Sequence, residues 1–578
     1  MQTDDSVVKQ RPQISKKLSP EFLWVVAIVI GVTLAMTRIP SVFVMGDVHP
    51  LGNDAFYHAT RILEIAEDPS SAHSFDANLH WPEGHWIAWP WAYDYLGGVL
   101  AGLFSGDQLG AAKIMAFYPL LWLIGSISLV GLIAREILRP GLAALCMLAY
   151  AAAPLTVTIF SVGALDHHSA EHFWFLLSLY LTGLWLTTPE SSRLSIALGM
   201  VLAAATAFHN SLFMLQLLVL TGLFLARLSG HALPANRQAT LFGVSLVVTQ
   251  LLVLLPSHHF LTFAYAFYLL SWFQLHVALL TAIGVFALCN KSDRVMWSVL
   301  LVAVVLALPT AVQVMFGMNY VNSQLPMFNS LQETQPMFGG SLSLLQINYF
   351  FTGLVWLLPV YVAYTVFQLY KRRVQGMTLI VMMTSLFGFA LMLAQFRFHY
   401  FGYLFLLIIP LLIIQQLLPR GRDILIAGLL ISGAYAYSIS YYLIPIKLGD
   451  SPRYAFNQPL INSVRTQCEK QPGLLLADND WGNFLRYRTQ CPIYANNFIL
   501  TRKEVDYINL SLGLFQKTPA QLRQSAPDVR YVMVNQMDLN PLSEALLSDE
   551  VFEGFTVIGE QRHPGGKVLG RLYGVEPK

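Results

Sequence analysis

The sequence predicts a polytopic α-helical membrane protein with about thirteen transmembrane helices, followed by a water-soluble mixed α/β domain outside the cytoplasm. Hydrophobic residues make up 55% of the 578 residues and charged residues only 12%, and the mean hydropathy is +0.54. A soluble globular chain of this length does not have such a composition. The net charge of +2 gives no indication of a nucleic-acid partner.

The first apolar run extends from Phe22 to about Val44 and follows a cationic segment with four basic residues, Lys9, Arg11, Lys16 and Lys17. The run is too long for the core of a signal peptide, and no small-residue cleavage site follows it. We therefore expect a retained anchor, with residues 1–21 in the cytoplasm.

Basic residues recur between the later apolar runs and set the predicted topology. They stand at Arg135 and Arg139, Arg193, Arg227 and Arg237, Lys291 and Arg294, residues 371–373, and Arg420 and Arg422. Between each two successive basic loops, the sequence has room for two membrane spans and one outer loop. Residues 22–445 thus form the predicted transmembrane domain, with outer loops at about 45–95, 161–170 and 318–343. Residues 256–290 fit either one long helix with an interfacial segment or two short spans.

Residues 446–578 form the predicted extracytoplasmic domain. Charged residues become much more frequent there, and the strand-like runs GLLLAD, YVMVN and FTVIG are separated by turn residues. Cys468 and Cys491 lie in this region, whereas Cys146 and Cys289 fall in membrane spans. The sequence leaves open whether Cys468 and Cys491 form a disulfide or remain two unpaired thiols.

The first polar candidate is Asp54 in HPLGNDAFYHATRIL, just before a helical pattern in the first outer loop. On this stretch alone, an N-cap aspartate is the favoured interpretation.

The second candidate is ALDHHSAEHF, residues 164–173, at the start of a membrane helix. Asp166 and His168, with one residue between them, can present an oxygen and a nitrogen to one divalent ion, and the helix dipole favours anionic ligands there. The alternative is an N-cap followed by histidines that reach to water. We favour metal ligands, because so many ionisable groups beside a membrane span are costly without a partner.

Two further candidates lie in later outer loops. Glu333 stands in NSLQETQPMF, where a solvated glutamate is the simplest interpretation. Arg397 in AQFRFHYFGY lies on the outer side, against the charge bias. An arginine there needs an anion: a headgroup, a protein carboxylate or a phosphorylated substrate.

These four stretches, in this order and on one face, resemble the catalytic subunits of oligosaccharyltransferases, especially the single-chain bacterial and archaeal members, which have the GT-C glycosyltransferase fold. The resemblance covers most of the chain. The matching motifs are Gly52-Asn53-Asp54, Asp166-His167-His168, Ser330-Leu331-Gln332-Glu333 and Arg397-Phe398.

The resemblance implies metal-assisted transfer of a glycan from a polyprenyl diphosphate carrier to an acceptor. Asp54, Asp166 and His168 are the implied metal ligands, and Arg397 the implied contact to the donor diphosphate. Asp54 and Glu333 are the implied catalytic residues that position the acceptor amide. Oxygen-rich ligands favour Mn²⁺ or Mg²⁺, and the histidine also allows Zn²⁺.

The motif that reads Asn-X-Ser/Thr acceptors departs from the family pattern. Family members carry Trp-Trp-Asp-Tyr-Gly in the soluble domain, and the matching stretch here is Asp478-Asn479-Asp480-Trp481-Gly482. Asp480 and Trp481 are the expected acceptor-binding residues, but the paired tryptophans are absent. The acceptor is therefore either a protein asparagine or another group, such as a lipid, a glycan or a different side chain.

A third alternative is a transporter or flippase for lipid-linked sugars. Such a protein places ionisable residues near the bilayer midplane and has internal repeats, whereas here the acidic residues collect at one face. The compact layout favours a single-subunit enzyme of the bacterial inner membrane with its active site facing the periplasm. Its expected partners are the polyprenyl-linked donor, the acceptor polypeptide and the lipid bilayer.

Overall fold

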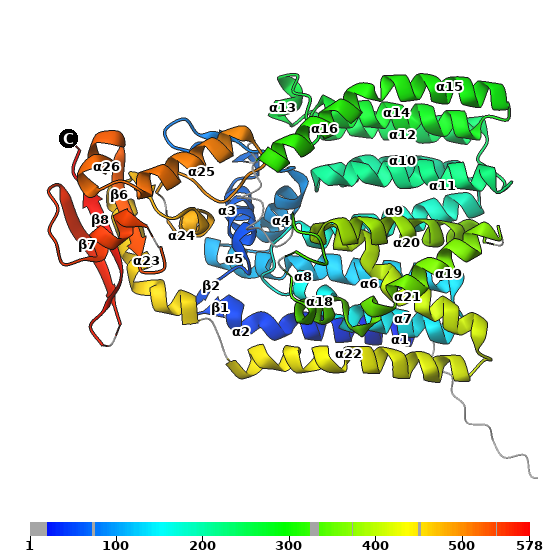
Figure 1. Cartoon of the computed structure of the whole chain (residues 1–578), viewed down its shortest axis with the longest axis horizontal. Coiled ribbons are helices and arrows are strands. Elements are labelled where there is room, and N and C mark those ends of the chain that lie inside the picture. The colour runs from blue at the N-terminus through cyan, green and yellow to red at the C-terminus, as the bar shows by residue number, and fades with distance from the viewer. Residues whose placement is uncertain are drawn as a thin grey trace, which may run out of the picture.

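The computed structural model has a long helical bundle at one end and a mixed α/β domain at the other, with α3, α4, α5 and α24 between them (Figure 1). The structure describes residues 20–578 except 72–74, 324–333, 341, 373, 449–451, 490, 539, 564 and 578. The side chains of Pro20 and of residues 318–323, 437–448 and 452–457 are also outside the description.

The first half of the chain contains most of the elements that surround the site. They are α1 (Pro20–Ala35), α2 (Ile39–Val42), β1 (Phe43–Val44), β2 (Asp47–Val48), α3 (Asn53–Glu67), β3 (Phe75–Asp76), β4 (His85–Trp86), α4 (Ala92–Leu103), α5 (Gln108–Ala116), α6 (Tyr118–Ile137), α7 (Pro140–Ala152), α8 (Pro154–Ile159), α9 (His168–Thr187), α10 (Ser192–Thr206), η3 (Asn210–Met214), α11 (Leu215–Leu228) and α12 (Asn236–Leu254).

The rest of the bundle consists of α13 (His258–Leu261), α14 (Trp272–Cys289), α15 (Asp293–Leu306), α16 (Leu308–Ser323), α18 (Leu344–Phe351), η5 (Gly353–Leu357), α19 (Leu358–Tyr370), α20 (Gly376–Ala394), η6 (Phe396–Phe398), α21 (His399–Leu417) and α22 (Arg422–Leu448). Residues 256–290 thus contain one helix of membrane length, α14, preceded by the single turn α13. This is the first of the two alternatives that the sequence left open.

Nine helical segments of the described residues are long and apolar enough to cross a membrane. They are Glu21–Val42, Gln108–Ile137, Asn210–Leu228, Asn236–Leu254, Trp272–Cys289, Asp293–Gly317, Gly353–Tyr370, Gly376–Ala394 and Phe396–Leu417. α7 and α10 are apolar but shorter. The exact number of about thirteen spans stays a prediction.

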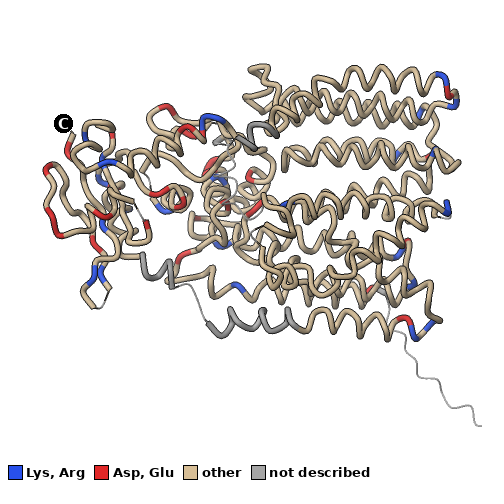
Figure 2. Tube along the Cα trace, viewed as in Figure 1, with Lys and Arg blue, Asp and Glu red and all other residues tan. Residues whose placement is uncertain are grey.

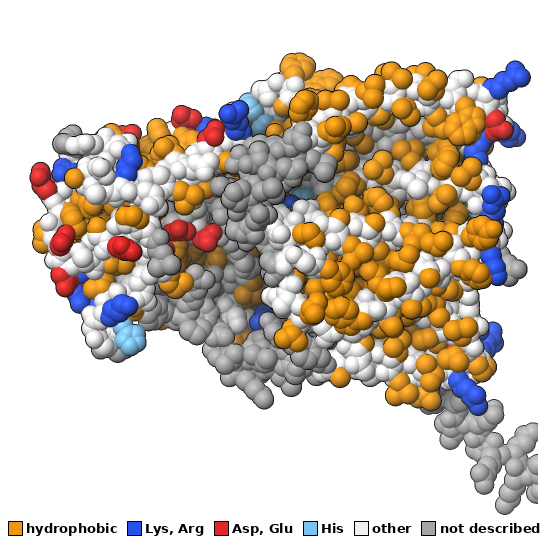
Figure 3. Space-filling view, in the orientation of Figure 1, with side chains coloured by type: hydrophobic (Ala, Val, Ile, Leu, Met, Phe, Trp, Pro, Cys, Tyr) orange, Lys and Arg blue, Asp and Glu red, His pale blue; other side chains and the backbone are white. Residues whose placement is uncertain are grey.

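The face of the bundle seen in Figure 3 is apolar over most of its length. None of the most apolar window of Asp293–Gly317 is buried inside the protein, and Leu301 and Val304 are 67% and 63% exposed. A protein surrounded by water rarely exposes such a continuous apolar surface, whereas lipid chains cover it without cost.

Lysines and arginines gather at the end of the bundle far from the mixed domain (Figure 2). Two of them form ion pairs between neighbouring helices, Arg139 with Asp423 at 2.7 Å and Arg227 with Asp293 at 2.5 Å. The basic loops predicted from the sequence therefore lie together, as expected for the cytoplasmic ends of membrane helices.

The mixed domain is built on a four-stranded sheet with the order β5-β6-β8-β7. Its elements are α23 (Pro452–Lys470), β5 (Leu474–Leu476), η7 (Asn479–Trp481), α24 (Gly482–Arg488), α25 (Arg502–Phe515), α26 (Pro519–Ser525), β6 (Val529–Asn535), α27 (Pro541–Leu547), β7 (Phe555–Arg562) and β8 (Val568–Val575). β5 and β6 are parallel, and the other pairs are antiparallel. The three predicted runs form β5, β6 and β7, as the sequence indicates.

Cys468 and Cys491 form a disulfide with a Cα–Cα distance of 5.3 Å. Both are fully buried in an apolar cluster with Leu475, Phe484 and Ile493. The bridge therefore ties the end of α23 to the chain just after α24, which settles the alternative left open by the sequence.

Replacing Cys468 and Cys491 by alanine should destabilise the mixed domain by about 3 kcal/mol, because the bridge closes a loop of 23 residues. Hydrogen exchange should become faster in α23 and α24. The matched control is Cys146→Ala with Cys289→Ala, which removes two buried free thiols from the bundle. Equal exchange in both double variants would show that the bridge does not stabilise this domain.

The mixed domain is docked through α24 on residues 45–95, the predicted first outer loop. The Arg488 guanidinium lies 2.5 Å from the Asp47 carboxylate, and that of Arg486 lies 2.8 Å from Glu64. The Tyr487 hydroxyl donates to the Val48 carbonyl at 2.9 Å. Three consecutive residues of α24 thus hold the start of this domain against β2 and α3.

A second contact joins the same loop to α25. His80 is fully buried and stacks on Tyr507 with 4.6 Å between ring centroids. His85 Nε2 lies 3.1 Å from the Glu504 carboxylate, and the Lys503 ammonium donates to the Gly84 carbonyl at 3.0 Å. Neither ring nitrogen of His80 has a hydrogen-bond partner within the described residues.

Acidification should weaken the contact between the first outer loop and α25. Burial, with His85 and Lys503, lowers the pKa of His80 to about 2. The folded-state pKa of His80 lies below that of an unfolded histidine. The stability that buried, neutral His80 contributes is therefore present above about pH 6.5 and is lost as the pH falls below it. At about pH 5, His80 takes up one proton when the contact opens, and this lowers the free energy of opening by about 2 kcal/mol.

The measurement is the thermal unfolding midpoint at neutral and acidic pH for the wild type and for His80→Phe, which keeps an aromatic ring against Tyr507. The charged and titratable groups around His80 are His85, Glu504, Lys503, Tyr507 and Glu83. They are the same in both proteins. An acid-induced decrease of equal size in both would exclude His80 as its cause.

Candidate metal centre

The amino-terminal half of α3 carries the first acidic motif. Gly52 precedes the helix with φ at +104°, a conformation that residues with a side chain rarely adopt. Gly52 occupies the N-cap position, so Asp54 lies inside the first turn and the N-cap interpretation of Asp54 is wrong. His58 follows one helical turn later and therefore lies on the same face of α3 as Asp54.

The second acidic motif lies between α8 and α9. His167 is the N-cap residue of α9, with no side-chain cap bond, and His168 is the first helical residue. Asp166 precedes them with its side chain 28% exposed, whereas His167 is buried. A partly exposed carboxylate and two imidazoles therefore lie at the start of a long apolar helix.

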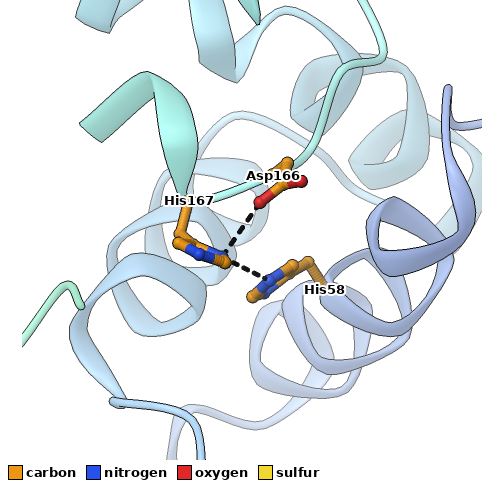
Figure 4. Close-up of side chains that lie close together, drawn as sticks. All are labelled: His58, Asp166 and His167. Carbon is orange, nitrogen blue, oxygen red and sulfur yellow. Dashed lines mark hydrogen bonds and ion pairs between the residues drawn. The ribbon is translucent and has the colours of Figure 1, made fainter. Parts of the chain in front are cut away.

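His58, Asp166 and His167 converge on one point (Figure 4). His167 Nδ1 lies 2.9 Å from the Asp166 carboxylate and 3.4 Å from His58 Nε2. One ligand atom of each residue lies within 4.8 Å of the other two. A carboxylate with two imidazoles is a donor set that suits a divalent cation.

A second group of potential ligands, His167, Glu171 and His209, adjoins the first. The Glu171 carboxylate is 1% exposed and lies 2.6 Å from His168 Nδ1 and 2.5 Å from His209 Nδ1. His209 stacks on His167 with 4.3 Å between ring centroids. Glu171 therefore links His168 of the second acidic motif to His209, the residue before η3.

Asp94 of α4 contacts the first group through His58. Its carboxylate is 0% exposed and lies 2.6 Å from His58 Nδ1 and 2.7 Å from Arg61 Nε. Burial disfavours a charged His58, but Asp94 and the more distant Asp166 and Asp54 outweigh it and raise the pKa of His58. Burial also opposes an ionised Asp94, yet His58 and Arg61 keep the pKa of Asp94 below its usual value.

The protonation states at the second acidic motif suit metal ligation. Burial disfavours the Asp166 carboxylate, but His168, His167 and His58 outweigh it and lower the pKa of Asp166. Burial lowers the pKa of His167 to about 4. An anionic carboxylate therefore lies beside a neutral imidazole at neutral pH, and metal ions bind these two forms.

The predicted ligands lie in the same region. His168 Nε2 is 3.7 Å from the Asp166 carboxylate, and Asp54 and Asp166 both act electrostatically on His58. Of the predicted ligands, the two close groups found among the described residues include Asp166 but neither Asp54 nor His168. Joint ligation by Asp54, Asp166 and His168 stays a prediction. Glu333 lies outside the described residues.

Arg397 stands in η6, two residues before His399 at the start of α21. His399 Nδ1 lies 3.2 Å from His172 Nε2, and the His399 ring lies 5.8 Å from that of His168. The predicted diphosphate ligand is therefore in a segment that contacts the histidines of α9.

The predicted acceptor residues lie beside the start of α3. The Asn53 side-chain amide donates to the Asp480 carbonyl at 3.1 Å. Trp481 packs on Phe484 with 5.7 Å between ring centroids, and Phe484 packs on Phe56 at 5.0 Å. η7 of the mixed domain is thus next to Asp54 in space, although it is far away in sequence.

Sequence reasoning missed His58, Asp94 and His209 as parts of the site. His58 lies four residues after Asp54, so helical spacing could have indicated it. Asp94 and His209 have no such local signal, because only the packing of α4 and η3 brings them to the cluster.

No family model matches the sequence. Two curated relatives from Archaeoglobus fulgidus match part of it. Dolichyl-phosphooligosaccharide-protein glycotransferase 1 is 32% identical over 155 residues, 26% of this chain and 25% of that protein. Dolichyl-phosphooligosaccharide-protein glycotransferase 2 is 29% identical over 184 residues, 32% of this chain and 30% of that protein. The matches thus span less than a third of either relative.

Solved structures of an archaeal oligosaccharyltransferase from Archaeoglobus fulgidus share the fold at 17% identity. The complex of AglB with an inhibitory peptide and a dolichol-phosphate has a TM-score of 0.71 and covers 90% of this chain and 70% of that one. A complex with Zn and sulfate has a TM-score of 0.69 and covers 96% and 73%. The chain therefore has the fold of this archaeal oligosaccharyltransferase over most of its length, and its long apolar helices indicate an integral membrane protein.

Proposed function

We propose that the chain is a membrane glycosyltransferase that moves a glycan from a polyprenyl (di)phosphate carrier to a protein asparagine. The observation that carries the proposal is the convergence of α3, the Asp166 motif and the Arg397–His399 segment on one partly buried cluster. The names of the relatives describe this activity, and one related structure holds a peptide and a dolichol-phosphate.

The transfer requires the acceptor amide nitrogen to attack the anomeric carbon of the sugar while the bond from that carbon to the phosphate oxygen breaks. Arg397 donates hydrogen bonds to the departing diphosphate. Asp54 and Glu333 accept hydrogen bonds from the acceptor amide and orient it, and its proton leaves to a carboxylate or to solvent. Asp54, Asp166 and His168 would hold a divalent cation, which when bound would supply charge stabilisation to the leaving group.

The donor atoms around Asp166 bear on the identity of the ion. Mg²⁺ prefers oxygen ligands, whereas Mn²⁺ and Zn²⁺ accept imidazole nitrogens readily. With His58, His167 and His168 beside Asp166, we expect Mn²⁺ or Zn²⁺ to bind better than Mg²⁺.

The proposed site faces the extracytoplasmic side, in a bacterium the periplasm, and the chain acts there as a single subunit. The described acidic residues near α3 and α9 lie toward the mixed domain, away from the basic end of the bundle (Figure 2). The disulfide in the mixed domain suits an oxidising compartment. A transporter would instead place its ionisable residues in the middle of the bundle.

A second candidate function keeps the same transfer chemistry but uses another acceptor. It is favoured by Asp478 and Asn479, which stand where the family has two tryptophans. The Asp478 carboxylate accepts from the Asp480 N–H at 3.0 Å and so holds η7 in place. Two small polar residues offer the acceptor's hydroxyl residue much less apolar surface than paired tryptophans.

The test uses the purified full chain with Mn²⁺, a labelled polyprenyl-linked donor and an Asn-X-Thr peptide, with the Gln-X-Thr peptide as the control. Label on asparagine alone is the expected result. Label transferred only to lipid, glycan or another side chain would support the second candidate. A donor that stays intact with every acceptor would contradict the proposed function.

A further inference from the structure

We propose that His58, oriented by Asp94, is a nitrogen ligand of the divalent ion at Asp166, in addition to the ligands that the sequence motifs imply. The inference rests on the proposed metal-assisted function, because it concerns the same ion. It assigns Asp94 to a positioning role behind the ligand, with no contact of its own to the ion.

The first step concerns the tautomer of His58. The Asp94 carboxylate can only accept hydrogen bonds, and it lies 2.6 Å from His58 Nδ1. Nδ1 therefore carries a hydrogen, and in the neutral ring Nε2 carries the lone pair. A buried carboxylate that holds a ring N–H in this way is the usual support of a metal-ligating histidine.

The second step concerns direction. His58 Nε2 faces His167 Nδ1, which in turn faces the Asp166 carboxylate (Figure 4). His58 and His167 are each only 2% exposed, so the nitrogen is held within the cluster rather than directed to solvent. The lone pair therefore points to the group of oxygen and nitrogen atoms expected to hold the ion.

The third step concerns spacing. The 3.4 Å between His58 Nε2 and His167 Nδ1 is long for a hydrogen bond. Two nitrogens bound to one tetrahedral metal ion, at about 2.0–2.1 Å each, stand about 3.3 Å apart. The His58 Nε2 lone pair is therefore not used in a strong hydrogen bond with His167, and the spacing leaves it able to bind an ion.

The fourth step concerns Asp54, the predicted carboxylate ligand on the same helix. Asp54 and His58 are one turn apart, so α3 presents a carboxylate and an imidazole to the same side. Arg61 follows on this face and binds the second oxygen of Asp94 at 2.7 Å, which fixes that carboxylate against His58. One helix thus supplies two ligands and part of their support.

The experiment loads the full chain in detergent with Mn²⁺ and counts bound imidazole nitrogens by pulsed electron paramagnetic resonance, with ¹⁵N-histidine as the isotopic check. The motif ligands Asp54, Asp166 and His168 predict a single imidazole. The inference predicts at least two. A single imidazole in the wild type overturns it, whatever the behaviour of any variant.

Variants then identify the residue. His58→Gln should lose one nitrogen coupling and bind Mn²⁺ about 10–100-fold more weakly. Asp94→Asn should weaken binding by about 10-fold, because an amide oxygen accepts the His58 N–H more weakly than a carboxylate does. The control is His258→Gln, which changes a histidine stacked on Trp86 away from the cluster. Unchanged couplings and affinity in His58→Gln would contradict the inference.

Failure of the inference and failure of the proposed function give different results. If the wild type transfers glycan with Mn²⁺ and has one bound imidazole, the function stands and His58 is not a ligand. If Mn²⁺ binds through two imidazoles and no acceptor is glycosylated, the ligand assignment stands and the function does not. Absence of Mn²⁺, Zn²⁺ and Mg²⁺ binding would overturn both.

Discussion

Asp166→Asn should lower the rate of glycan transfer by about 10³-fold, the largest effect that we expect from a single substitution. The Asp166 carboxylate contacts His167 at 2.9 Å and His168 at 3.7 Å, and its side chain is the most exposed of the three. An amide of the same shape keeps the volume but removes the negative charge that attracts the ion. The measurement is the initial rate of transfer over a range of Mn²⁺ concentrations.

The matched control for Asp166→Asn is Asp506→Asn, which removes a carboxylate from the exposed side of α25. It should leave transfer close to the wild-type rate, since surface substitutions of this kind change stability little. If Asp166→Asn kept a third or more of the wild-type rate at every Mn²⁺ concentration, Asp166 would not be a ligand of a catalytic ion.

Glu171→Gln should cost both stability and activity. The Glu171 carboxylate is almost fully buried and uses one oxygen for His168 and the other for His209. Glutamine offers one acceptor oxygen, so one imidazole loses its partner and faces an N–H₂ group instead. Breaking such a buried pair costs about 3 kcal/mol, and freeing a ligand from its support costs about 10–100-fold in activity.

Thermal unfolding and Mn²⁺-dependent transfer together test this prediction. Glu136→Gln is the control, because Glu136 is an exposed carboxylate at the basic end of the bundle. Glu171→Asp keeps two acceptor oxygens and should recover part of the lost stability. Wild-type stability and transfer in Glu171→Gln would mean that the carboxylate does not hold the two histidines.

The sequence predicted the membrane fold and the mixed domain well, because both follow from local patterns. Apolar runs, basic loops and the strand runs that became β5, β6 and β7 are each visible within a few residues of chain. β8 was missed because glycine and arginine interrupt its apolar pattern. Residues 256–290 stayed open because hydropathy alone does not separate α13 from α14.

The site was predictable only where its residues follow each other in the chain. Asp166 and His168 are two residues apart and were found together, whereas Asp94 and His209 come from other elements. The N-cap interpretation of Asp54 was wrong because Gly52 and its positive φ start the helix two residues earlier. Asn53 and Asp480 meet only through the docking of α24, which no local pattern encodes.

The most direct test of the central claim is an anomalous diffraction map of the full chain crystallised with Mn²⁺. We predict one strong peak between α3 and the start of α9, within coordination distance of Asp54, Asp166 and His168, with His58 completing the ligand set. A peak at the basic end of the bundle, or Asp54 and Asp166 on different ions in separate cavities, would contradict the account.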